Sequence, residues 1–179
     1  MIKKITLVIL ALINILALIY LVSPAPSLPD LPNSVKSDLP GDTVQIKDTT
    51  ALFTNMTRTE VINFYKASFS GPFRIIINHP PEKARQIWQE TTQSYYLEEF
   101  ILPFKQSLYI NGFEWEKDVF IKPEQRIKNK ILYQDKEYQA KVTLRLFPAK
   151  IGNRIFVFFL TEGLFIFSFL TYKKFLSHR

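Results

Sequence analysis

The chain has 179 residues and a formal net charge of +7, with 11 prolines, 5 glycines and no cysteine. The lack of cysteine excludes disulfides, cysteine-based zinc sites and thiol nucleophiles. Basic and acidic residues are interleaved along the middle of the chain, as in EWEKD and YQDKEY, so the composition does not predict a nucleic-acid-binding stripe.

Two apolar segments, one near each end, dominate the sequence. Residues 5–22 and 155–172 are each 18 residues long, and a helix of that length reaches about 27 Å, close to the ~30 Å hydrocarbon core of a bilayer. We therefore predict two transmembrane helices. The chain then divides into an N-terminal anchor, a Pro-rich linker, an extracytoplasmic domain, a second transmembrane helix and a basic tail, at residues 1–22, 23–42, 43–150, 151–172 and 173–179.

Each apolar segment has an alternative interpretation. The first follows MIKK and precedes SPAPS, so it also resembles a cleaved signal peptide, although its apolar run exceeds the usual length of about 7 to 15 residues. The second contains Glu162, and the run RIFVFFL at its start is also consistent with a buried strand followed by a helix inside the domain. We favour membrane spans for both segments.

The charges that flank these segments predict the orientation of the chain. Lys3 and Lys4 precede the first segment, whereas the stretch after it contains Lys36 and three aspartates. The positive-inside rule then places the amino terminus in the cytoplasm, and a second span returns the carboxyl terminus to the same side. We predict a two-pass protein of the cell membrane whose central domain lies outside the cytoplasm.

The central domain is predicted to be α+β. Thr57 and Glu60 match a capping box before a helix at residues 58–69, and further helices are predicted at residues 81–92 and, with a kink, at residues 97–108. Strands are predicted at residues 43–46, 50–53, 73–78, 113–119, 130–133 and 138–147, the last two as a hairpin. The predicted fold is a small antiparallel sheet packed with two to three helices and flanked by N- and C-terminal transmembrane helices.

No catalytic or ligand-binding motif stands out in the sequence. Walker A, GxGxxG, GxSxG and SxxK patterns are all lacking. His79 stands at a predicted strand-to-helix turn, where a lone histidine more often makes local hydrogen bonds than catalyses a reaction. Glu114, Glu116 and Asp118 would share one strand face that suits a hard cation, but Lys117 among them favours a solvated face. We predict no catalytic residue, cofactor or metal, and therefore no enzyme.

Two polar residues within the predicted spans, Asn14 and Glu162, are predicted to pair. In antiparallel helices they would lie at matching depths of about 14 and 15 Å. Desolvation favours the neutral carboxyl of Glu162, which can donate to the amide oxygen of Asn14 and accept from its nitrogen. We interpret the pair as a structural clasp; the alternatives are pairing of Glu162 with another subunit and, third, a proton relay.

A second candidate site is a group of basic residues on and near the strand at residues 138–147. Lys141 and Arg145 share one face of this strand, and Lys136 and Lys150 lie beside it in the sequence. The four residues could contact an anionic lipid surface or an acidic envelope polymer, at about 1 kcal/mol for each residue. The alternative, which we favour, is the ordinary solvated face of a sheet.

The runs TTALFTNMTRTEVINFYKASF, INGFEW and KVTLRLF resemble an uncharacterised family of small two-span bacterial membrane proteins. These runs cover most of the predicted outer domain, and they consist of packing residues. The resemblance therefore implies the architecture and no activity or site.

Together these features predict a membrane-anchored binding or scaffolding protein of the bacterial envelope. The alternative is a small subunit of a larger membrane complex, for transport or assembly, that acts through its transmembrane helices. The expected partners are the lipid bilayer and either another membrane protein or a second copy of the chain in a homo-oligomer; no nucleic-acid partner is expected.

Overall fold

The computed structural model describes residues 2–40, 42, 48–69, 71, 73–79, 96–118 and 121–177. The chain forms two compact units. A helical unit combines Met1–Ala25 with Pro148–Arg179, and a sheet unit comprises Pro26–Phe147.

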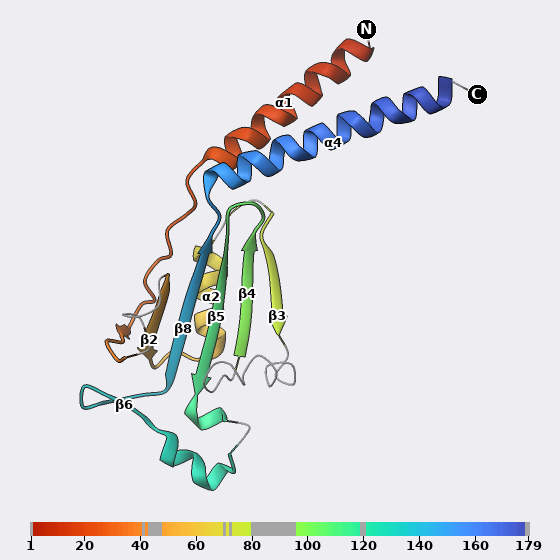
Figure 1. The fold of residues 1–179 in the computed structure, drawn as a ribbon. Helices are drawn as coiled ribbons and strands as arrows, with labels where there is room; N and C mark the ends of the chain where they lie inside the picture. Colours follow the sequence, from red (N-terminus) through yellow and green to blue (C-terminus); the bar gives the residue numbers. More distant parts are fainter. Residues whose placement is uncertain are drawn as a thin grey trace. The chain divides into compact units, whose positions relative to one another are not determined.

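The sheet unit is built on a six-stranded antiparallel sheet, in which β3, β4 and β5 form a meander and β8 lies between β5 and β2 (Figure 1). In spatial order, the strands are β1 (Ser34–Lys36), β2 (Thr49–Thr54), β8 (Ala140–Pro148), β5 (Gln106–Glu114), β4 (Tyr96–Leu102) and β3 (Ile75–His79). This architecture confirms the predicted α+β class with its antiparallel sheet.

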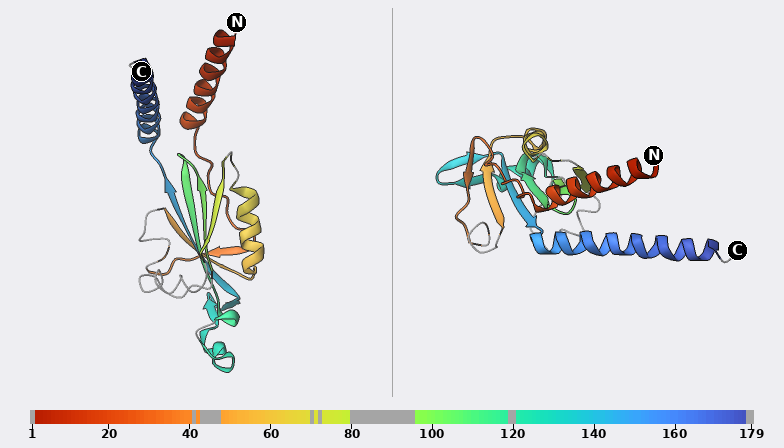
Figure 2. Two further views of the ribbon diagram at one scale, coloured as in Figure 1. Left: turned by 90° about the vertical axis from the view of Figure 1, so that its right-hand side faces the viewer. Right: turned by 90° about the horizontal axis from the view of Figure 1, so that it is seen from above.

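Helix α2 (Arg58–Ser68) packs against one face of the sheet (Figure 2). The predicted capping box is confirmed, because the Thr57 side chain accepts from the backbone of Glu60 and the Glu60 carboxylate accepts from the Thr57 backbone N–H at 2.7 Å. Val61, Ile62 and Tyr65 of the helix are buried, which is one face of an amphipathic helix. The core between the two layers contains Leu31, Leu52, Val61, Ile62, Tyr65, Phe69, Phe100, Leu102, Leu108, Ile110, Val142 and Leu144.

The helix predicted at residues 97–108 is wrong, because these residues form the hairpin of β4 and β5. Leu97 and Phe100 are both buried although they point to opposite faces of β4. The sequence of this strand therefore lacks the alternation of apolar and polar residues that a strand with one buried face shows. Apolar residues on both faces imitate the three- and four-residue spacing of a helix. Residues 103–105 form the turn of the hairpin, and Phe104 adopts a φ of 65° there.

Part of the predicted Pro-rich linker belongs to the sheet unit. Strand β1 pairs with β2, and Leu31, which precedes it, is buried in the core. Proline-rich chain favours an extended conformation, which here lies along the sheet instead of forming a free tether.

The segment after β5 differs from the prediction in two places. The predicted strand at residues 113–119 is wrong at residues 115–118, because β5 ends at Glu114 and the short 3₁₀ helix η1 (Trp115–Lys117) follows. A second 3₁₀ helix, η2 (Pro123–Asn129), follows. The strand predicted at residues 43–46 and the helix predicted at residues 81–92 lie outside the described residues.

The predicted hairpin of residues 130–133 with 138–147 forms differently. β6 (Ile131–Tyr133) pairs with the short β7 (Lys136–Tyr138), whereas β8 joins the large sheet. Tyr133 stacks on Phe53 at 4.3 Å between ring centroids and donates to Asp38 Oδ1 at 2.7 Å. This hydrogen bond raises the pKa of the Tyr133 hydroxyl above its usual value.

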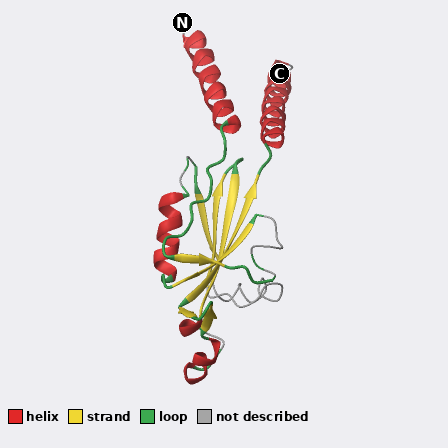
Figure 3. Cartoon of the chain, turned by 90° about the vertical axis from the view of Figure 1, so that its left-hand side faces the viewer, coloured by secondary structure: helices red, strands yellow, loops and turns green. Residues whose placement is uncertain are grey.

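The helical unit contains the two apolar helices, α1 (Ile2–Val22) and α4 (Ile151–Ser177) (Figure 3). Both are long and apolar enough to cross a membrane, and most of their apolar side chains are exposed. The alternative of a buried strand at the start of the second segment is wrong, because α4 is continuous.

Candidate functional site

The best-defined polar site of the helical unit is the junction of α1 and α4, formed around Arg154. The Arg154 side chain is only 4% exposed. Its guanidinium donates to Leu21 O at 3.2 Å and to Ser23 O at 3.4 Å, both at the carboxyl end of α1, and to Ala149 O at 2.7 Å. One side chain at the start of α4 therefore joins the end of α1 to the residue before α4.

The chemistry of a helix end explains this arrangement. The last carbonyl groups of an α-helix have no partner within the helix and carry its partial negative charge. Arginine, with five donors and a permanent positive charge, suits several such carbonyls at once. The junction also fixes the antiparallel order of the two helices, because it joins the carboxyl end of α1 to the amino end of α4.

In the part of the chain that the structure describes, Asn14 and Glu162, the predicted intramembrane pair, form no hydrogen bond with each other. The Asn14 amide donates to Leu10 O of its own helix at 3.1 Å, and Glu162 is partly exposed on α4. The clasp of Asn14 with Glu162 therefore stays a prediction. Arg154 was not among the site residues predicted from the sequence; its position directly before the second apolar segment was the available signal.

The four basic residues of the second candidate site are distributed over different elements. Lys141 and Arg145 lie on the same face of β8, as predicted, while Lys136 is in β7 and Lys150 belongs to the helical unit. The Lys141 ammonium pairs with Asp42 Oδ1 at 2.9 Å, and the Arg145 guanidinium lies 4.8 Å from the Phe147 ring centroid. Contact of the four residues with an anionic surface stays a prediction.

A group of buried charges surrounds the amino end of α2. Glu114, which is fully buried, accepts from the Arg58 backbone N–H at 2.5 Å and pairs with Lys117 at 2.9 Å. Glu98 accepts from the Arg58 guanidinium at 2.7 Å and from the Asn78 amide at 2.7 Å. A carboxylate at a helix amino terminus is favourable for the helix dipole, and each carboxylate here has internal partners. The arrangement fixes α2 on the sheet.

The acidic residues considered as a metal site do not form one in the described part of the chain. Glu114 is buried, Glu116 is exposed on η1, and Asp118 accepts from the Asn129 amide at 3.3 Å. The described residues contain no group of three or more residues that could hold a metal ion. The side chain of His79 lies outside the described residues.

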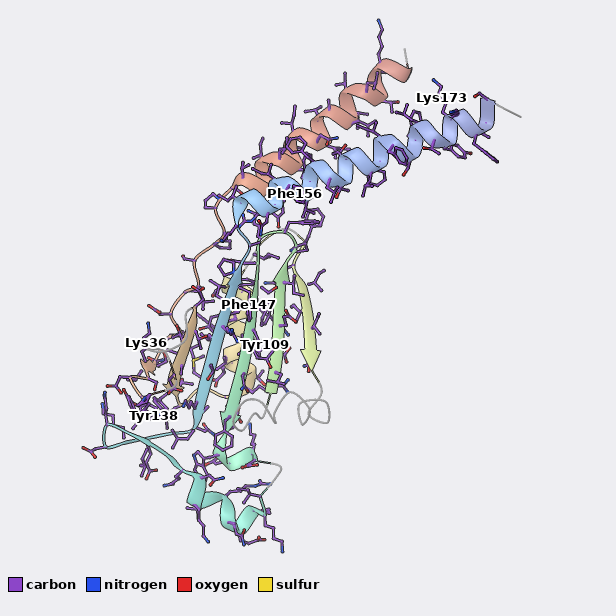
Figure 4. The ribbon with its side chains drawn as sticks, viewed as in Figure 1. Lys36, Tyr109, Tyr138, Phe147, Phe156 and Lys173 are labelled. Atoms are coloured by element: carbon purple, nitrogen blue, oxygen red, sulfur yellow. The ribbon has the colours of Figure 1, made fainter. Side chains whose placement is uncertain are left out.

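The face of the sheet opposite α2 carries a mixture of polar and aromatic side chains, and we call Tyr109, Thr143 and Arg145 the open face. These residues alternate with core residues along β5 and β8, so they point away from α2. Figure 4 shows Tyr109 among the side chains of the neighbouring strands. Burial raises the pKa of the Tyr109 hydroxyl, and the charge of Glu99 raises it further, so the hydroxyl stays protonated at neutral pH.

Both chain connections between the two units leave from one end of the sheet. Gln106, the first residue of β5, donates to Pro26 O at 2.8 Å, where the sheet unit begins. β8 ends at Pro148, beside the start of β5, and α4 begins at Ile151. We call this end, at which β8 ends and β5 begins, the helix-linked end of the sheet.

Comparison of the chain with protein-family models, with curated proteins and with solved structures finds no match. The resemblance to a family of small two-span bacterial membrane proteins therefore stays a prediction.

Proposed function

We propose that the chain is a two-pass membrane protein that holds a binding or scaffolding domain at the outer surface of the bacterial cell membrane, with both termini in the cytoplasm. The observation that carries this proposal is the pair of exposed apolar helices joined at Arg154. Exposed apolar side chains in such number are unfavourable in water and favourable in lipid. The lipid bilayer is accordingly the first partner.

The short connections support a domain held close to the membrane. Three residues, 23–25, separate α1 from the sheet unit, and two residues, 149–150, separate β8 from α4. An extended chain spans at most about 3.6 Å for each residue, so neither connection allows the domain to move far from the helices. A domain on two short connections suits the binding of a partner at the membrane surface.

The open face of the sheet is the surface that we propose for this binding. It offers the exposed guanidinium of Arg145 beside the half-buried Thr143, and arginine is enriched in protein interfaces. No catalytic role is proposed for it.

The alternative is a small subunit of a larger membrane complex that acts through its helices. The observation in its favour is the exposed aromatic surface of α4, on which Phe156, Phe159, Phe165, Phe167 and Phe169 are each more than half exposed. Aromatic side chains on a helix can pack against further transmembrane helices.

Site-specific photocrosslinking in living cells separates the two functions. A photoreactive amino acid replaces Thr143 on the open face in one variant and Phe159 on α4 in another. The proposal predicts specific protein crosslinks from position 143. Crosslinks to an integral membrane protein from position 159, with none from position 143, would support the subunit function and contradict the binding function.

A further inference from the structure

Exposed phenylalanine side chains gather at the helix-linked end of the sheet. Phe104 lies in the turn between β4 and β5 and is 58% exposed, and Phe73, just before β3, is 76% exposed. Both turns lie at this end, because Ile75 of β3 pairs with Ile101 near the end of β4. Phe147, near the end of β8, is 48% exposed (Figure 4).

The backbone holds Phe73 and Phe104 in defined positions. They have φ angles of 62° and 65°, in the left-handed region that residues other than glycine rarely adopt. The Arg74 guanidinium donates to Phe69 O at 3.2 Å and to Lys66 O at the end of α2, which fixes the turn before β3. Such conformations are retained where the surrounding structure requires them.

The turn before β3 is also packed closely against β4. A Cβ atom at Gly71 would lie 2.8 Å from Leu102 Cδ2, which is too close for any other residue without a shift of the leucine. Leu102 is itself buried in the core. The two phenylalanines therefore extend from fixed turns on adjacent strands.

The chain connections limit how far the helix-linked end of the sheet can lie from the ends of the helices. Val22 of α1 and Pro26 are four residues apart, and Pro148 of β8 and Ile151 of α4 are three residues apart. An extended chain covers these steps in about 14 Å and about 11 Å at most. If the helices span a bilayer, the points at which the chain enters and leaves the helix-linked end of the sheet stay within this reach of the membrane surface.

We propose that Phe73 and Phe104 insert into the interfacial region of the lipid bilayer and seat the sheet unit on the membrane. This inference rests on the proposed function, since it requires the helices to span the bilayer. An apolar side chain that enters the boundary between headgroups and acyl chains leaves water, which favours the seated position. The chemistry that recognises these side chains is that of the lipid interface and not of one particular headgroup.

Depth-dependent fluorescence quenching tests this inference on the full chain. The chain has no cysteine, so single variants Phe73→Cys and Phe104→Cys can each carry one environment-sensitive fluorophore. The labelled protein is reconstituted in phosphatidylcholine vesicles with or without lipid that bears a nitroxide high on its acyl chain. Leu12→Cys in α1 reports on the span, and Leu132→Cys, 67% exposed in β6, is a control on the same unit.

The inference predicts a blue-shifted emission and a loss of fluorescence with nitroxide lipid at positions 73 and 104, but not at position 132. Quenching at position 12 with none at positions 73 and 104 would overturn the inference and leave the membrane anchors in place. No quenching at position 12 would contradict the proposed function itself. Because both phenylalanines are exposed and are labelled in separate variants, the failure of one variant to fold leaves the other as the test.

Discussion

Arg154 joins the two helices of the helical unit through its side chain. Its guanidinium binds carbonyl oxygens at the end of α1 and before α4, so its removal would leave three backbone acceptors without this donor. Hydrogen bonds to a charged group typically contribute about 1.5 to 3 kcal/mol, because the donor carries a full charge. The junction should therefore depend on this side chain.

Arg154→Leu should loosen the junction of α1 and α4. With spin labels on the double variant Val22→Cys/Ile151→Cys, the distance distribution should be narrow in the parent chain and broad with Arg154→Leu. Arg154→Lys, which keeps the charge but has fewer donors, should give an intermediate width. Lys150→Leu removes an exposed neighbouring charge and is the control. Equal distributions in all four proteins would contradict this role of Arg154.

The site was only partly predictable at the residue scale. The polar residues inside the apolar segments, Asn14 and Glu162, are conspicuous in the sequence because polar groups in a span are costly. Arg154 is not conspicuous, since a basic residue at the border of a span is common. Its role depends on which carbonyl groups lie within reach of its guanidinium. These are known only once two segments that are far apart in the sequence are placed side by side.

Among the helices and strands, those whose formation depends on a short sequence pattern were predicted from the sequence. Helix α2 was predicted because its capping box and its apolar spacing both lie within a dozen residues. The hairpin of β4 and β5 was missed because the burial of Leu97 on one face and Phe100 on the other depends on the rest of the sheet. The position of β1 in the sheet was missed for the same reason.

Thr57→Ala should destabilise the sheet unit by about 0.5 to 2 kcal/mol, since it removes the side-chain acceptor at the amino end of α2. The change in the free energy of unfolding is measured by chemical denaturation of the full chain in detergent, followed by tryptophan fluorescence. Thr57→Ser, which keeps the hydroxyl, is the matched control and should remain within about 0.5 kcal/mol of the parent. If the alanine variant is as stable as the serine variant, the capping contribution is negligible.

The same capping box should make stability depend on pH. Hydrogen bonds from the Thr57 backbone N–H and hydroxyl lower the pKa of Glu60 below its ordinary value of 4.5. The charged form is therefore stabilised in the folded state, so this contribution is present above pH 4.5 and is lost as the pH falls through the lowered pKa. Glu60→Gln should weaken the pH dependence in this acid range, and an unchanged acid profile would contradict the assignment.

At the scale of the whole molecule, the sheet unit has its own core and should fold without the helices. A fragment of residues 26–147 should melt cooperatively, because it retains all six strands and α2. A fragment of residues 41–147 lacks β1 and the buried Leu31, so it should be less stable by at least about 2 kcal/mol. Equal stability of the two fragments would show that the segment before residue 41 contributes nothing to the core.

We propose that two membrane spans place the sheet unit outside the cytoplasm. Labelling of cysteine variants with a membrane-impermeant maleimide, in cells whose cytoplasmic membrane is intact, measures on which side each position lies. Glu124→Cys lies at an exposed position of η2, and Ser177→Cys lies at an exposed position at the end of α4. We expect labelling of Glu124→Cys in intact cells and of Ser177→Cys only after permeabilisation. Labelling of both in intact cells, or of Ser177→Cys alone, would contradict it.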